Sequence, residues 1–250
     1  MDLNSYRAIF SSDWNECLAP CGPFDFVAFN YPQFEEKLTD VFRKYTSNRI
    51  SLGKAVTLID AMLPESITPD QIDAYLERAF VVYRGVPELI DWCARHAVLF
   101  MINTTGMIGY FQRVFAKQLL PVVPVLSACP MIRFEPASSD PPYIHDLLET
   151  PDKGRNTAAV QQNLGIPSDR VLLMGDSGGD GPHFEWGAQQ GALLIGSMTK
   201  VSLSDFCADR DILIDVFFGC SYRPGETKDL SKEMAVDFRD LIPIIERAIT

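Results

Sequence analysis

The segment AIFSSDWNECLAP, residues 8–20, passes from an apolar run into a polar, turn-prone loop. The run YRAIF at 6–10 favours a short buried strand, and the serines, Asp13 and Asn15 that follow are typical of a loop. Asp13 is therefore expected directly after the C-terminal end of the strand, with the amide of Asn15 two positions further on.

The same arrangement recurs along the chain. The apolar run AVLFMIN at 97–103 leads into Thr104, Thr105 and Gly106, and VLLM at 171–174 leads into GDSGGDGP. Apolar runs also predict strands at 192–196 and 215–219, and helical periods separate these runs. The helix predicted for 153–165 closes at a glycine, and in the C-terminal helix AVDFRDLIPIIERAI a proline marks a kink or a start. Buried strands that alternate with helices predict an α/β fold, a Rossmann-like, mainly parallel sheet with helices on both faces.

Residues 25–85 interrupt this alternation with helical patterns alone. Thr68, Pro69 and Gln71 form a capping box with proline at the first helical position, which predicts a helix start. We therefore expect a Rossmann-like core at 1–24 and 86–250, with a helical cap at 25–85 inserted after the first strand.

In a doubly wound sheet, ligands gather outside the carboxyl ends of the strands. Asp13, Thr104 and Asp176 each follow an apolar run, and Lys153 opens the helix that precedes the last of them. A carboxylate can attack phosphorus, a lysine and a metal offset the charge, and a hydroxyl orients the oxygens, so this set suits phosphoryl transfer. Mg²⁺ prefers hard oxygen ligands, here the carboxylates of Asp13 and Asp176 and the main-chain carbonyl of Asn15.

Four segments, in this order, resemble the motifs of the haloacid dehalogenase (HAD) superfamily. SSDWNECL stands at the family's DxDGT motif, INTTG at its strand-end Thr or Ser, DKGRNT at its lysine and GDSGGD at its acidic GDxxxD motif. The resemblance covers nearly the whole chain. Within the superfamily, the sequence is most similar to the phosphoserine phosphatase and methylthiopentenyl phosphate phosphatase branches, which have a C1-type helical cap.

The resemblance implies a magnesium-dependent phosphomonoester phosphatase that acts on a small phosphorylated metabolite through an aspartyl-phosphate. It makes Asp13 the nucleophile and a metal ligand, Asp176 a second metal ligand and Asp180 an acid behind the metal. The phosphate ligands that it implies are Thr104, Thr105, Gly106 and Lys153.

Asn15 departs from the family pattern. The phosphatases carry there an Asp that protonates the leaving oxygen and deprotonates the attacking water, and an amide cannot do either, a loss of about 10²- to 10⁴-fold. Glu16 and Cys17 replace the usual Gly and Thr, and Glu16 is a poor substitute acid because neighbouring residues in an extended loop point to opposite sides. Two alternatives stay open: a catalytically impaired relative that binds a phosphorylated ligand, and a dehalogenase-like enzyme that cleaves carbon–halogen bonds.

The composition argues against some classes of binding partner. The 22 Lys and Arg against 33 Asp and Glu give a net charge of −11, which opposes binding to nucleic acid or to an anionic membrane. The N-terminus lacks a basic region followed by an apolar one, and no apolar run reaches about 18 residues, so we expect a cytoplasmic protein. The six cysteines lack a CxxC pair and are expected to be reduced. The sequence leaves the oligomeric state open.

Overall fold

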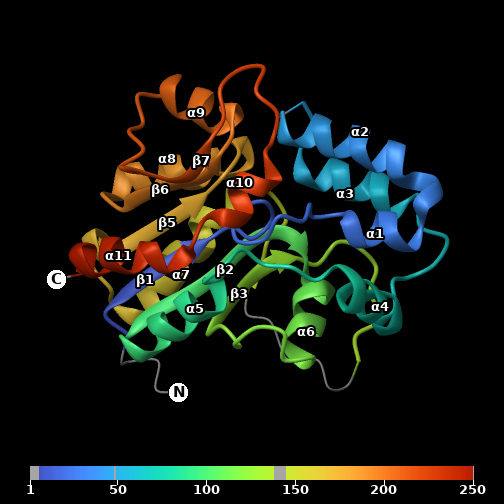
Figure 1. Ribbon diagram of the computed structural model, residues 1–250, viewed down its shortest axis with the longest axis horizontal. Coiled ribbons are helices and arrows are strands. Elements are labelled where there is room, and N and C mark those ends of the chain that lie inside the picture. Colours follow the sequence, from blue (N-terminus) through green and yellow to red (C-terminus); the bar gives the residue numbers. More distant parts are fainter. Residues whose placement is uncertain (1–5, 48, 138–144, 250) are drawn as a thin grey trace.

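The computed structural model describes residues 6–47, 49–137 and 145–249. At its centre is a seven-stranded sheet in the order β4-β3-β2-β1-β5-β6-β7, and each neighbouring pair is parallel (Figure 1). The predicted α/β class with a Rossmann-like parallel sheet is confirmed. The strands are β1 Ala8–Ser12, β2 Val98–Met107, β3 Val125–Cys129, β4 His145–Asp146, β5 Val171–Gly175, β6 Leu193–Thr199 and β7 Val216–Ser221.

The strands are buried on both faces because successive side chains point to opposite sides. Phe10 and Phe100 face one apolar cluster, whereas Ile9 and Leu99 face the other. The first cluster is completed by α5 Val86–Arg95, α6 Ile108–Ala116 and α11 Ile242–Ile249, and the second by α7 Asp152–Leu164, α8 Gly181–Gln190 and α9 Val201–Ala208. Helices thus cover both faces, as predicted.

The chain between β1 and α5 is helical and stands beside the sheet (Figure 1). The capping box predicted at Thr68 is present, since its side chain accepts from the Gln71 backbone N–H while the Gln71 side chain accepts from the Thr68 N–H. The helices in this region are α1 Asp25–Asn30, α2 Glu35–Thr46, α3 Leu52–Asp60 and α4 Pro69–Ala79.

Ion pairs and hydrogen bonds hold α3 and α4 against the rest of the chain. Asp73 of α4 lies 2.8 Å from Arg113 of α6, and Asp60 at the end of α3 lies 3.0 Å from Arg133. The Glu149 carboxylate accepts both backbone N–H groups of Leu52 and Gly53 at the start of α3. The proposed boundaries of the cap at 25–85 stay a prediction.

The structure differs from the sequence-based expectation in several elements. Strand β2 is longer than the predicted apolar run at 97–103 and continues through Thr104–Met107, with an irregular register against β3. The C-terminal helix begins at Ile242, so Pro243 lies in its first turn and does not kink it. Sequence reasoning missed β4, α8, α9 and α10 Leu230–Ala235. The prolines at 136, 141, 142 and 151 predict an irregular stretch at 135–152, and 138–144 of it lie outside the described residues.

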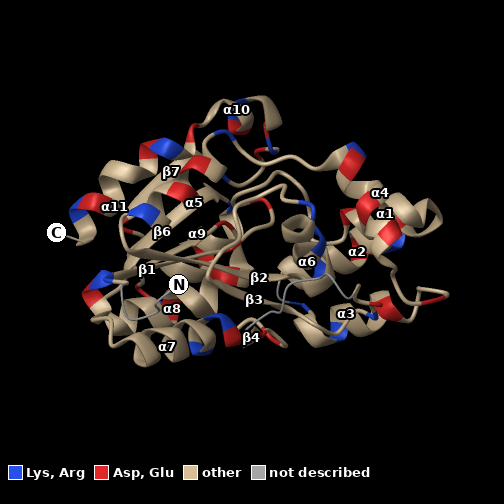
Figure 2. Cartoon of the chain, turned by 90° about the horizontal axis from the view of Figure 1, so that it is seen from below, with Lys and Arg blue, Asp and Glu red and all other residues tan. Residues whose placement is uncertain are grey.

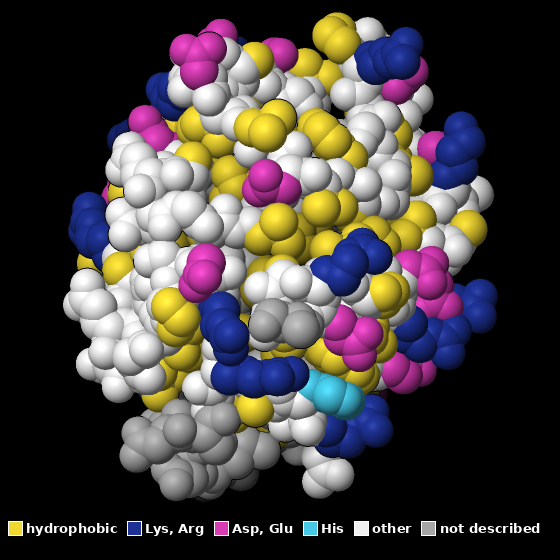
Figure 3. Space-filling model, turned by 90° about the vertical axis from the view of Figure 1, so that its left-hand side faces the viewer, with side chains coloured by type: hydrophobic (Ala, Val, Ile, Leu, Met, Phe, Trp, Pro, Cys, Tyr) yellow, Lys and Arg dark blue, Asp and Glu magenta, His cyan; other side chains and the backbone are white. Residues whose placement is uncertain are grey.

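The surface mixes both signs of charge. Basic and acidic residues alternate over the helices in Figure 2, and on the face shown in Figure 3 they surround apolar side chains. All six cysteines are free thiols, as expected. Among the described residues, none of the helices combines the length and apolar character that a membrane span requires.

Candidate functional site

The carboxyl ends of three adjacent strands bring the candidate residues together. Asp13 follows β1, Asp176 follows β5 and Lys200 follows β6. The Asp13 backbone N–H donates to Met174 O at 2.9 Å, and the Lys200 N–H donates to Asp176 O at 2.8 Å, so the sheet ladder continues into the site. One carboxylate oxygen each from Asp13, Asp176 and Asp180 lie within 4.8 Å of one another.

Lys153 neutralises part of this acidic group. Its ammonium lies 2.9 Å from Asp13 Oδ1 and donates a hydrogen bond to Asp180 Oδ1 at 2.5 Å, and the side chain is 2% exposed. Burial lowers the pKa of Lys153, but the charges of Asp13 and Asp180 outweigh burial and raise it, so the lysine is charged. The backbone carbonyl of Lys153 accepts from Asn103 Nδ2 and Thr157 Oγ1, both at 2.9 Å, which fixes the start of α7 against β2.

The three carboxylates differ in their surroundings. Burial raises the pKa of Asp13, against the opposing charge of Lys153, and burial raises the pKa of Asp176 further. Burial acts on Asp180 too, but Lys153 and the backbone N–H groups of Asp176 and Ser177, which donate to Asp180 Oδ2, hold its pKa below its usual value. Asp180 is therefore the most firmly ionised of the three, and it orients Lys153 and the loop that carries Asp176.

Thr104 and Thr105, at the end of β2, lie beside these charged residues. Thr104 Oγ1 donates to Asn15 Oδ1 at 3.2 Å and accepts the Gly106 N–H at 3.0 Å, so this hydroxyl is turned toward Asn15. Thr105 lines the pocket beside the Asp13 carboxylate, where it also lies against Tyr45 of α2. Thr105, and not Thr104, is thus the residue of this pair that lines the pocket.

Asn15 and Glu16 occupy the loop after the nucleophile position. Asn15 Nδ2 donates to the Cys21 carbonyl at 3.3 Å, so both ends of its amide have partners. Glu16 adopts a left-handed backbone conformation, with φ of 57°, and its carboxylate pairs with the ammonium groups of Lys200 and Lys228. Burial would raise the pKa of Glu16, but the two lysines lower it, so Glu16 is ionised and has no proton to donate.

Two adjoining pockets share Asn15 and Pro23. The first encloses about 310 Å³ of empty space, part of it open to solvent, and is lined by the carboxylates, Lys153 and Lys200, with Tyr45 and Phe42 from α2. The second encloses about 220 Å³ and is lined mainly by apolar and aromatic groups, Phe26, Tyr75, Met107, Tyr110 and Phe111.

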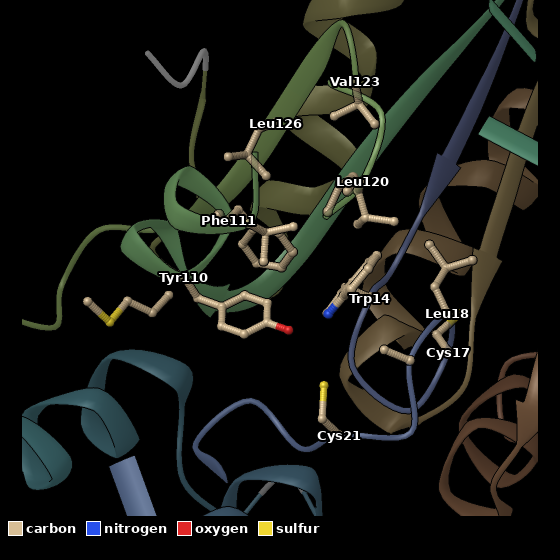
Figure 4. Close-up of a cluster of buried hydrophobic side chains, with 14 of the residues drawn as sticks. Trp14, Cys17, Leu18, Cys21, Tyr110, Phe111, Leu120, Val123 and Leu126 are labelled. Atoms are coloured by element: carbon tan, nitrogen blue, oxygen red, sulfur yellow. The ribbon is translucent and has the colours of Figure 1, made fainter. Parts of the chain in front are cut away.

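A buried polar group borders the second pocket. The Tyr110 hydroxyl and the Trp14 indole N–H point toward each other beside the Cys21 thiol (Figure 4), and neither has a well-aligned nitrogen or oxygen partner among the described residues. The contacts with the weakly polar thiol leave the hydrogen-bonding capacity of both groups largely unused.

His183, Arg133 and Arg155 do not line the pocket. His183 is buried beneath the site, bonded to Thr157 Oγ1 at 3.0 Å, and burial lowers its pKa to about 3. Arg133 pairs with Asp60 and Arg155 with Asp152, and neither lines the pocket. Sequence reasoning missed Tyr45, for which no local signal exists, and Lys200, which the strand-end rule applied to β6 identifies.

The residues present suit a divalent cation such as Mg²⁺. Asp13 Oδ1 and Asp176 Oδ2 are buried oxygens that accept no well-aligned hydrogen bond within the described residues, and the ammonium groups of Lys153 and Lys200 face them. Carboxylate oxygens with unused lone pairs, close together and backed by Asp180, are the donor set that a hard cation prefers.

Comparison with known proteins identifies the fold. No family model and no curated protein matches the sequence. Among solved structures, the phospho-aspartyl intermediate analogue of phosphoserine phosphatase aligns over 96% of this chain and 99% of its own, with a TM-score of 0.66 and 13% identity. A HAD family hydrolase from Salmonella enterica subsp. enterica serovar Typhi aligns over 96% and 72% (TM-score 0.69, 13% identity), and cytosolic 5′-nucleotidase IIIB bound to cytidine over 97% and 86% (TM-score 0.57, 15% identity). At 13–15% identity, these likenesses show that the chain has the fold of these phosphatase and hydrolase structures.

Proposed function

We propose that the protein is a phosphomonoester hydrolase of the HAD type that works through an aspartyl-phosphate at Asp13. The observation that carries the proposal is the contact of a buried carboxylate at a strand exit, Asp13, with a buried ammonium, Lys153, in a pocket that also holds Asp176 and Asp180. This arrangement supplies a nucleophile together with positive charge for a phosphoryl group.

In the first step, an Asp13 carboxylate oxygen attacks phosphorus, the ester P–O bond breaks, and the leaving oxygen takes the electron pair. Lys153 holds Asp13 in place and stays charged beside the phosphoryl oxygens, while the Thr105 hydroxyl supplies a donor from the opposite wall. The leaving oxygen takes its proton from water, because Asn15 and the ionised Glu16 have none to give. In the second step, water attacks the acyl phosphate, which releases inorganic phosphate and restores Asp13.

Mg²⁺, when bound by Asp13, Asp176 and the main-chain carbonyl of Asn15, supplies positive charge that offsets the phosphoryl oxygens. Asp180 supports this site through the backbone of Asp176 and Ser177. The substrate is a small phosphorylated metabolite, whose phosphate binds in the polar pocket beside Asp13 and Lys153.

A second candidate, a phosphate-ligand-binding protein with impaired turnover, is favoured by one observation. The amide of Asn15 is held at both ends, by Thr104 and Cys21, so this position is built for a neutral group. The third candidate, cleavage of a carbon–halogen bond, predicts halide release that chelator leaves unchanged, whereas both phosphate-based functions predict that chelator abolishes binding or turnover.

The decisive experiment is acid quenching of the protein with ³²P-labelled phosphoester. We expect a covalent label on Asp13 that hydroxylamine releases, and we expect Asp13→Asn to lose both the label and turnover of p-nitrophenyl phosphate. Asp146→Asn is the matched control, because Asp146 is an acid on a strand of the same sheet that does not line the pocket. Undiminished turnover by Asp13→Asn would contradict the proposal.

A further inference from the structure

Glu16 is an unusual acid for its position, because the backbone there is left-handed and the resembling motif has glycine. Its two carboxylate oxygens are each engaged by a lysine: Oε2 by Lys200, and Oε1 by Lys228 at 2.9 Å. Lys228 is held independently of Glu16, since it donates to Pro20 O at 3.1 Å and lies 3.6 Å from Glu233. Glu16 is thereby fixed at the rim of the pocket.

Lys200 joins Glu16 to the candidate metal ligand Asp176. Its ammonium lies 2.6 Å from Asp176 Oδ2, and its backbone N–H donates to the Asp176 carbonyl, so the two residues are tied through main chain and side chain. The Asp176 side chain is 1% exposed, whereas that of Lys200 is 29% exposed. One end of this ion pair is therefore fixed in the interior and the other has room to move toward solvent.

An ammonium and a divalent cation seek the same lone pairs of Asp176. Because like charges at such a short separation repel strongly in a buried site, both cannot share the Oδ2 atom of Asp176. Moving the ammonium away from Asp176 is inexpensive here, since Glu16 already pairs with it and keeps it neutralised. Without Glu16, the displaced ammonium would lose its counter-charge.

We propose that Lys200 is a displaceable internal cation, which occupies Asp176 until a divalent cation takes that carboxylate and which is then retained by Glu16. Lys200 thereby sets the affinity of the site for the metal and stabilises the loop after β5 when metal is scarce. The inference rests on the assignment of Asp176 as a metal ligand in the proposed function.

The test is calorimetric titration of the whole chain with Mg²⁺ alone at constant ionic strength. We expect Lys200→Met to lower the dissociation constant by about tenfold or more, because the competing charge is removed from Asp176 itself. Lys228→Met is the matched control, since it removes the same charge from the same Glu16 without touching Asp176, and we expect a change below about threefold. If both variants tighten binding equally, general electrostatics explains the effect and the competition is refuted.

A second readout is thermal unfolding in EDTA and in excess Mg²⁺. In EDTA, Lys200→Met should unfold at a lower temperature than the wild type, since Asp176 loses its counter-ion. Excess Mg²⁺ should raise the unfolding temperature of Lys200→Met by more than it raises that of the wild type. Lys200→Gln carries the same expectations if the methionine variant folds poorly. Asp176→Asn distinguishes a failure of the metal assignment from a failure of the proposed competition by Lys200. If this variant still binds Mg²⁺, Asp176 is not a metal ligand, and both the assignment in the proposed function and the competition are overturned. If binding is lost, the assignment stands and the Lys200 variants alone decide the competition.

Discussion

Restoring an acid at position 15 tests the chemical reasoning most directly. The Asn15 amide accepts from Thr104 Oγ1 at 3.2 Å and donates to the Cys21 carbonyl at 3.3 Å. In Asn15→Asp, a protonated carboxyl reproduces both bonds, because its carbonyl oxygen accepts from Thr104 and its O–H donates to Cys21. The ionised form instead sets a negative oxygen against the Cys21 carbonyl, beside the carboxylates of Asp13 and Glu16.

These contacts raise the pKa of the introduced carboxyl and favour its neutral form, which is the form that a general acid requires. We expect Asn15→Asp to increase the hydrolysis of an alkyl phosphate by about 10²- to 10⁴-fold, the usual contribution of general acid–base catalysis. The increase should be much smaller for p-nitrophenyl phosphate, whose leaving group departs without a proton. The stability cost should stay near 1 kcal/mol, the value of one exchanged hydrogen bond.

The assay compares kcat/KM for the two substrates, with urea unfolding of each variant alongside. Asn156→Asp is the matched control, because Asn156 Nδ2 also donates to a backbone carbonyl, that of Asp146 at 2.8 Å, but does not line the pocket. If a folded Asn15→Asp that still binds Mg²⁺ hydrolyses the alkyl phosphate within about threefold of the wild type, the reasoning about the missing acid is wrong.

Two further predictions concern the charges of the site. Lys153→Met leaves Asp13 and Asp180 buried without their shared cation, and we expect a loss of about 3–5 kcal/mol in the free energy of unfolding, measured in urea at pH 7; a loss below about 1 kcal/mol would contradict the ion pairing. The folded pKa of Glu16 lies below its ordinary value of 4.5, so its ionised form adds stability that is fully present above pH 4.5 and disappears as the pH falls through the lower folded pKa. The stability difference between wild type and Glu16→Gln should therefore be constant from pH 5 to 7 and vanish in stronger acid, whereas a pH-independent difference would show that the two lysines do not act through its charge.

The fold follows from the sequence largely because its strands are buried on both faces. Ile9 and Phe10 belong to opposite apolar clusters, so β1 reads as a continuous apolar run, and the exits of such runs place Asp13 and Asp176 on one edge. The two-residue β4 is too short to form such a pattern. The length of β2 is less predictable, because hydroxyl residues and glycine favour a turn after residue 103, whereas pairing with β3 keeps the chain extended to Met107.

The site is less predictable where it depends on tertiary contacts. Tyr45 reaches Thr105 from α2, and nothing in its local sequence distinguishes it from a tyrosine that packs in a core. The backbone conformation of Glu16 likewise overturns the alternation expected of an extended loop, and the resulting contacts with Lys200 and Lys228 join residues far apart in the chain.

The ion pair between Glu16 and Lys228 has a consequence for synthesis on the ribosome. The two residues are 212 positions apart, and Tyr83, which donates to Glu233, is 150 positions from its partner. At roughly 5–20 residues per second, the loop after β1 is made about 10–40 s before Lys228 exists. During that interval Glu16 has no partner from this segment, and Lys200, which is made before Lys228, is the first of its two lysine partners to become available.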